Sequence, residues 1–107
     1  MKPKILWIGL HPDHVDYSKF SYLTPEKLAA FLKEETRNLN NAGYDAQVCL
    51  IDRGQTAEQV IKNSLNEMNY QAIIIGAGIR TDKDCLILFE KIINIVHQYA
   101  TQAKICF

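Results

Sequence analysis

Four short stretches of the chain are rich in apolar residues and lack helical periodicity. They cover residues 4–10, 46–52, 72–75 and 104–107, and the third of them reads Ala-Ile-Ile-Ile. Strands that are buried on both faces carry apolar runs of this kind, because β-branched side chains fit both sides of a pleated sheet. The pattern therefore predicts four strands, with residues 72–75 near the centre of the sheet.

Apolar residues recur at helical spacing in the three longer stretches between these strands. The first predicted helix covers residues 25–42 and stops at Gly43, which suits the left-handed turn that ends many helices. The second covers residues 57–68 and follows a Thr-x-x-Gln capping box that begins at Thr56. The third covers residues 82–101. Strands and helices alternate throughout, which is typical of a parallel sheet with helical crossovers.

We expect an α/β fold in which residues 1–107 form one flavodoxin-like domain, a three-layer αβα sandwich with strand order 2-1-3-4. In this topology the first helix covers one face of the sheet, and the other two helices cover the opposite face. One face of strands 3 and 4 is then left bare. This face could be covered by a further helix that follows strand 4 in a longer product, or by a second copy in a homodimer. We favour the further helix.

Composition narrows the possible functions. Twelve basic and twelve acidic residues give a net charge of zero, so no basic surface for nucleic acid is expected. No apolar run approaches the ~20 residues of a membrane span, and the apolar stretch near the N-terminus is too short for a signal peptide. Three widely spaced cysteines indicate reduced thiols. These features predict a cytoplasmic protein without nucleic-acid or membrane partners.

Polar residues follow strands 1 and 3, whose carboxyl ends meet at the topological switch point of this fold, where open α/β sheets bind ligands. A long connection, residues 11–23, carries several aromatic side chains and is expected to fold over this edge. A pocket for a small polar ligand would be lined by His11, Asp13, His14, Gly76, Gly78, Arg80 and Thr81. The other interpretation is that these residues only solvate the loops.

Residues at this edge are compatible with three specific chemistries. His11 and His14 can bind a metal, but no third ligand is identified and loop histidines are more often solvated. Arg80 can bind an anion, although Asp82 and Asp84 in the same turn would repel it. Cys85 can act as a nucleophile at a helix start, although its position in the apolar pattern favours a buried thiol.

Two neighbouring apolar residues, Leu86 and Ile87, are predicted on the outward side of the third helix. We expect the loop of residues 17–23 to cover them; the alternative is an exposed patch that binds a partner.

The sequences Lys-Ile-Leu-Trp-Ile-Gly-Leu at residues 4–10 and Ile-Gly-Ala-Gly-Ile-Arg at residues 75–80 resemble those of a family of small bacterial flavodoxin-like (Rossmann-like) α/β proteins. The resemblance covers nearly the whole chain and implies the fold, with a further helix after strand 4, but no chemistry. The fold is also similar to that of response-regulator receiver domains. Their acidic pair and phosphoacceptor aspartate are replaced here by Leu10-His11-Pro12 and Gly76, which argues against phosphotransfer.

The sequence thus predicts a protein that binds a small polar ligand or metal at the carboxyl edge of its sheet. It identifies no cofactor and leaves open whether the protein is an enzyme. The alternative is a non-catalytic interaction or homodimerisation module that uses the bare face of strands 3 and 4. A metal-dependent hydrolase ranks third.

Overall fold

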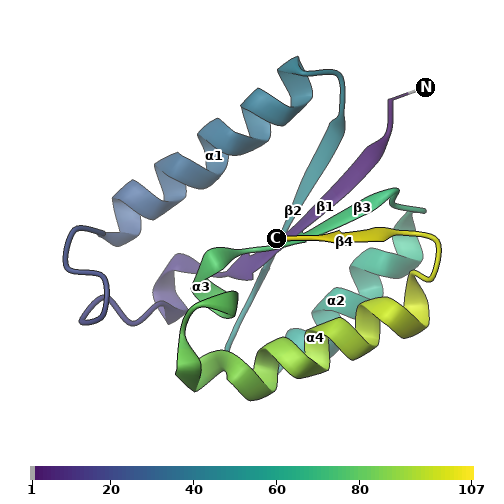
Figure 1. The fold of residues 1–107 in the computed structure, drawn as a ribbon. Helices are drawn as coiled ribbons and strands as arrows, with labels where there is room; N and C mark the ends of the chain where they lie inside the picture. Colours follow the sequence, from purple (N-terminus) through teal and green to yellow (C-terminus); the bar gives the residue numbers. More distant parts are fainter. Residues whose placement is uncertain (1) are drawn as a thin grey trace.

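The sheet has four parallel strands in the order β2-β1-β3-β4 in a computed structural model that describes residues 2–107 (Figure 1). The strands are β1 (Lys4–Leu10), β2 (Asp45–Ile51), β3 (Ala72–Ile75) and β4 (Lys104–Cys106). β1 pairs with β2 along its whole length and with β3 from Ile5 to Ile8. The predicted fold class and strand order are confirmed.

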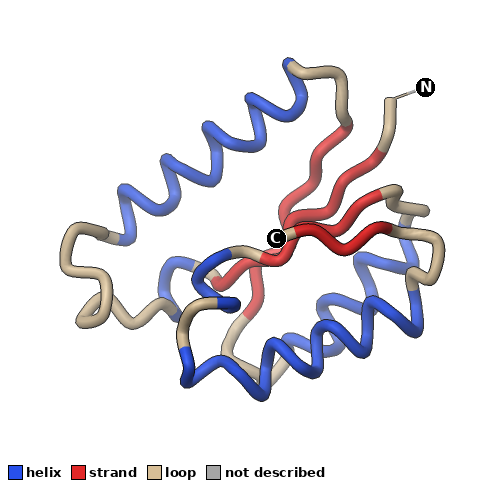
Figure 2. Tube along the Cα trace, in the orientation of Figure 1, coloured by secondary structure: helices blue, strands red, loops and turns tan. Residues whose placement is uncertain are grey.

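Helices lie on both faces of the sheet, as Figure 2 shows. α1 (Pro25–Asn41) lies on one face, and α2 (Ala57–Glu67) and α4 (Leu86–Tyr99) lie side by side on the other (Figure 1). Three short helical turns complete the chain: η1 (Pro12–His14), α3 (Ala77–Arg80) and η2 (Lys83–Cys85). No helix within residues 2–107 is long and apolar enough to cross a membrane.

The hydrophobic core lies between the sheet and the α2–α4 layer. Alternate strand residues that point to this face are fully buried, among them Leu6, Ile8, Ile73 and Ile75. α4 contributes Ile92 and other apolar residues one and two turns apart, as the helical period requires. One side of the sheet therefore carries nearly all of the apolar burial that stabilises the domain.

The opposite face is only partly covered. α1 packs on β2 and has no buried residue, although its apolar positions follow the predicted helical period. Phe31, which projects from α1, is 51% exposed, and its ring meets the ring of Trp7 edge-on at 6.5 Å between centroids. On this side no described helix lies over β3 and β4, so a half of one sheet face is open.

The polypeptide between β3 and α4 differs from the prediction. A helix from residue 82 was expected, but α3 forms first, η2 follows, and α4 begins only at Leu86. The Asp82 side chain accepts the N–H of Asp84 and so caps the start of η2. Residues 77–80 are helical because the Gly76 carbonyl accepts N–H groups from Ile79 and Arg80.

Two smaller expectations were also wrong. Thr56 makes no side-chain cap on α2; its hydroxyl instead donates to Asp52, whose carboxylate accepts the N–H groups of Thr56 and Ala57 and so caps the helix. Leu86 and Ile87 are not covered, since they are 63% and 72% exposed on the first turn of α4. The left-handed turn at Gly43 is confirmed, with φ of 103°.

Candidate functional site

The topological switch point lies between β1 and β3. The Gly76 N–H donates to the Ile8 carbonyl at 2.9 Å, which is the last bond between these strands on that side. Beyond it β1 continues along β2, and the His11 N–H donates to the Ile51 carbonyl at 2.9 Å. The strands diverge here, so the segments that follow them leave the sheet in different directions.

The predicted histidines flank η1 directly after β1, with His11 as its N-cap and His14 as its last residue. The rings of His11 and His14 are exposed, and their centroids are 6.1 Å apart. The Nδ1 atom of His11 accepts the Asp13 N–H at 3.1 Å and lies 3.6 Å from the Asp13 carboxylate. Within residues 2–107 no group of three histidine, cysteine or acidic side chains is arranged to hold a metal ion.

The glycines after β3 differ in their surroundings. A Cβ atom on Gly76 would lie 3.2 Å from the indole nitrogen of Trp7 and 3.3 Å from the Ile8 carbonyl oxygen. A Cβ atom on Gly78 would meet no heavy atom within 4 Å. Gly76 is therefore required by the close approach of Trp7 and β1, whereas the packing around Gly78 leaves room for a side chain.

Arg80 and Thr81 are used in contacts inside the domain. The Nε atom of Arg80 donates to the Ile75 carbonyl at 2.8 Å, and its guanidinium lies over the Phe107 ring, 5.6 Å from the centroid. The Thr81 hydroxyl donates to the Ala77 carbonyl at 2.6 Å. The structure thus places these two side chains against α3 and the end of β4, whereas the histidines lie on η1.

A charged cluster that sequence reasoning missed connects the loops at this edge. The Asp82 carboxylate is 1% exposed, and its Oδ1 atom lies 2.6 Å from the Nζ atom of Lys19. Lys19 also lies 2.6 Å from the exposed carboxylate of Asp84. Arg53 approaches the other Asp82 oxygen at 3.5 Å. We call these four residues the loop cluster: Lys19, Arg53, Asp82 and Asp84.

Arg53 extends this cluster to two further groups. Its Nε atom donates to the His14 carbonyl at 2.7 Å, and one terminal nitrogen lies 3.4 Å from the Cys85 sulfur. The loop cluster therefore joins the connection after β1, the connection after β2 and the η2 turn. Because a buried charge is costly unless it is paired and hydrogen-bonded, these contacts hold the three connections in one arrangement.

The electrostatics of the loop cluster follow from this geometry. The hydrogen bond from Lys19, with the Asp84 N–H and the nearby Arg53, holds the pKa of Asp82 below its usual value. The hydrogen bonds to Asp82 and Asp84 raise the pKa of Lys19. Both partners are therefore charged at neutral pH, and the cluster is an internal ion-pair network.

The cysteine at this edge lies in the core. Cys85 is buried, and this burial raises the pKa of its thiol, which opposes formation of the nucleophilic thiolate. Burial also raises the pKa of Cys49. The geometry agrees with the inert-thiol interpretation of Cys85.

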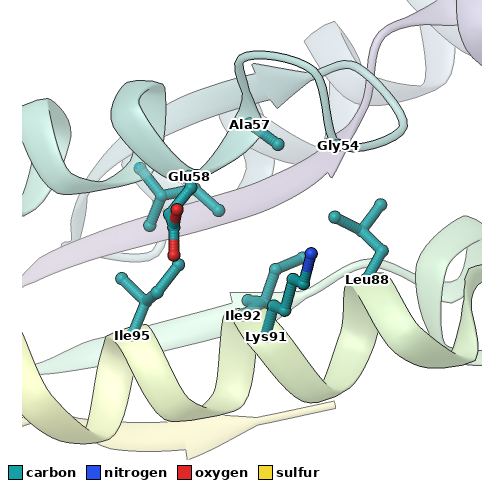
Figure 3. Close-up of a pocket in the computed structure, with 8 residues that line it drawn as sticks. Gly54, Ala57, Glu58, Leu88, Lys91, Ile92 and Ile95 are labelled. Atoms are coloured by element: carbon teal, nitrogen blue, oxygen red, sulfur yellow. The ribbon is translucent and has the colours of Figure 1, made fainter.

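Two hollows in the molecular surface lie away from the switch point. A small cavity of about 30 Å³ lies between α2 and α4, with Glu58 and Lys91 among the residues around it (Figure 3). That volume suits one or two water molecules. A wider groove, of about 480 Å³, lies between α1 and β2.

Comparison of the chain with protein-family models, with curated proteins and with solved structures gives no match.

The clustering of Lys19 and Arg53 around Asp82 has no signal in the sequence spacing, because the three residues come from different connections. The only indication was the pair of acids, Asp82 and Asp84, close behind β3. Asp82 also accepts the Asp84 N–H within this turn. Its two cationic partners became apparent only from the folded arrangement.

Proposed function

We propose that this chain is a non-catalytic interaction module that forms a homodimer through the open half of its sheet. The observation that carries the proposal is the unequal covering of the α1 face: α1 packs on β2, and no described helix packs over β3 and β4. Trp7 and Ile74 on this face are only half-buried, and Phe31 of α1 is largely exposed beside them. Large apolar surfaces of this kind mark association sites.

The amount of exposed surface agrees with this proposal. The chain has a mass of 12.2 kDa and an accessible surface of 6672 Å². A folded monomer of that mass exposes about 6,100 Å². The chain therefore exposes about 600 Å² more than an average monomer of its mass, as expected if a partner covers part of its surface.

The shape of the face favours a second copy as the partner. One half of the face carries α1 as a ridge, and the other half is flat. If two copies meet face to face about a two-fold axis parallel to the strands, α1 of each copy lies over β3 and β4 of the other. The same patch then serves both copies, as an isologous interface requires. Each α1 gains the apolar contacts that it lacks in one chain.

Trp7 is the only tryptophan in the chain and lies on the proposed interface, so its fluorescence can report association. We expect the emission of the unmodified chain to shift to longer wavelength on dilution, because dissociation exposes the indole to water. Phe31→Glu should abolish this dependence on concentration, since it places a charge in the interface. Leu86→Glu is the matched control, because Leu86 is also a large, exposed apolar residue but lies on α4, on the opposite face.

The control should shift on dilution as the unmodified chain does. Emission that is independent of concentration in all three proteins would contradict the homodimer. So would a Phe31→Glu protein that keeps the full shift.

The second candidate is binding of a small polar ligand or metal at the carboxyl edge of the sheet. The observation that favours it is the pair of exposed imidazoles, His11 and His14, on the single turn η1. Under this proposal Zn²⁺ at a hundred times its dissociation constant stabilises the fold by ~2.7 kcal/mol. The thermal shift should disappear in His14→Ala and persist in His97→Ala, which removes the remaining histidine of the chain on α4. An equal shift in both variants would exclude this site.

A further inference from the structure

The outer edge of the sheet at β2 lies beside the groove under α1. The groove has a volume of about 480 Å³. Its wall comes from α1 and its floor from β2, and its lining residues are Leu32, Lys33, Thr36, Arg37, Asn40, Val48 and Leu50. This surface is on the far flank of α1 from the open half-face of β3 and β4.

The backbone of β2 offers free hydrogen-bonding groups at this edge. The Asp45 N–H donates to the Pro3 carbonyl, and the Ile51 carbonyl accepts the His11 N–H, so alternate residues from Asp45 to Ile51 face β1. The residues between them face outward. The Ala46 N–H is satisfied by the Asn40 side chain at 2.9 Å. Among the described residues, the outward N–H and C=O groups of Val48 and Leu50 have no partner.

The side chains around this edge define the chemistry of an occupant. Leu32 on the α1 wall and Val48 and Leu50 on the floor give the groove an apolar lining. Lys33 and Arg37 lie one turn apart on the rim, and Arg37 pairs with Glu34 at 2.5 Å. Lys33 has no ion pair among residues 2–107. The rim is therefore net positive, and it favours an occupant with acidic groups near apolar ones.

We propose that β2 binds an extended peptide segment of a partner protein, apolar at alternate positions and acidic at its ends, which adds to the sheet as a fifth strand. The free groups of Val48 and Leu50 are two residues apart, a repeat of about 6.6 Å that the backbone of another strand matches. Edge addition of this kind takes its affinity from main-chain hydrogen bonds and its specificity from pockets for alternate side chains. The groove beside Val48 supplies such a pocket.

The test uses a blocked hexapeptide of alternating valine and threonine with an aspartate at each end, titrated into the intact chain. We expect saturable binding, and amide hydrogen exchange at Val48 and Leu50 that slows at least tenfold when the peptide is bound. The same peptide N-methylated at the residues that face β2 should bind at least tenfold more weakly, because it lacks the backbone donors.

Two protein variants test the two parts of the site. Val48→Pro removes the outward N–H; it is compatible with an edge strand because that N–H takes no part in the β1 ladder. It should weaken binding about tenfold, whereas the control Val48→Thr, which keeps the N–H, should bind normally. Lys33→Glu should weaken binding of the acidic peptide several-fold at low salt, with a smaller effect at high salt.

Equal affinity for the peptide and its N-methylated form would overturn the proposal, whatever the behaviour of the protein variants. Absence of binding at millimolar peptide would also overturn it. The surface is separate from the homodimer interface, so Phe31→Glu should leave peptide affinity unchanged, and failure of either proposal can be distinguished from failure of the other.

Discussion

Replacing Asp82 with asparagine tests whether the loop cluster stabilises the fold. The substitution keeps the size of the side chain and removes the charge of a carboxylate that is 1% exposed and 2.6 Å from the Lys19 ammonium. A hydrogen bond to a charged group contributes ~1.5–3 kcal/mol to stability. Lys19 keeps the Asp84 carboxylate as a partner, so we expect a loss of about 2 kcal/mol at pH 7.

This loss has a measurable thermal equivalent. A chain of 107 residues unfolds with an entropy of roughly 0.22 kcal/mol/K, so about 2 kcal/mol lowers the melting temperature by about 9 °C. Asp84→Asn is the matched control. Asp84 also contacts Lys19, but its side chain is 69% exposed, so its replacement should change stability by less than about 0.5 kcal/mol.

The effect of Asp82→Asn should also depend on pH with a definite sign. The pKa of Asp82 is lower in the folded state than in the unfolded state, where an aspartate titrates near ~3.9. The carboxylate therefore contributes its stability above about pH 4, and that contribution is lost as the pH falls through the lower folded pKa. Urea unfolding from pH 7 to pH 3 should show the two proteins converging in acid. A difference under about 0.5 kcal/mol at pH 7, or one that stays constant to pH 3, would refute this reasoning.

Two further predictions concern local packing and thiol exposure. Gly76→Ala should lower the free energy of unfolding by about 1 kcal/mol or more, because its Cβ would press on the Ile8 carbonyl and Trp7. Gly78→Ala should raise the free energy of unfolding by up to about 1 kcal/mol, because it replaces a glycine within helix α3. Thermal melts of both variants check these effects, and equal effects would contradict them. A thiol reagent should modify only Cys106 in the folded chain, because Cys49 and Cys85 are buried. This labelling should be slower at high protein concentration, because Cys106 lies on β4, which the proposed homodimer covers. Rapid labelling of all three thiols would contradict the described core.

The strands and their order could be predicted from the sequence because each depends on local composition and chain topology. Unbroken apolar runs such as residues 72–75 favour a strand inside the sheet, and right-handed crossovers then limit the possible orders. The positions of α1 and of the open half-face followed from the same topology. These features depend on backbone geometry that is common to all sequences with this pattern.

The polar details could not be predicted because they depend on contacts between distant residues. Lys19 and Asp82 are 63 residues apart, and nothing in their spacing indicates a 2.6 Å contact. The helical period of α1 also gave no sign that its apolar residues would stay partly exposed, since periodicity identifies the face that turns inward and not how closely it packs. The cover expected over Leu86 and Ile87 also depended on a contact between distant segments, and both residues are exposed.

The most direct test of the homodimer is the mass of the unmodified chain in solution, measured by sedimentation equilibrium over a range of concentrations. If α1 of each copy covers β3 and β4 of the other, the mass at high concentration is twice the chain mass of 12.2 kDa and falls towards a single chain on dilution. A mass of one chain at every concentration up to the millimolar range would contradict the homodimer.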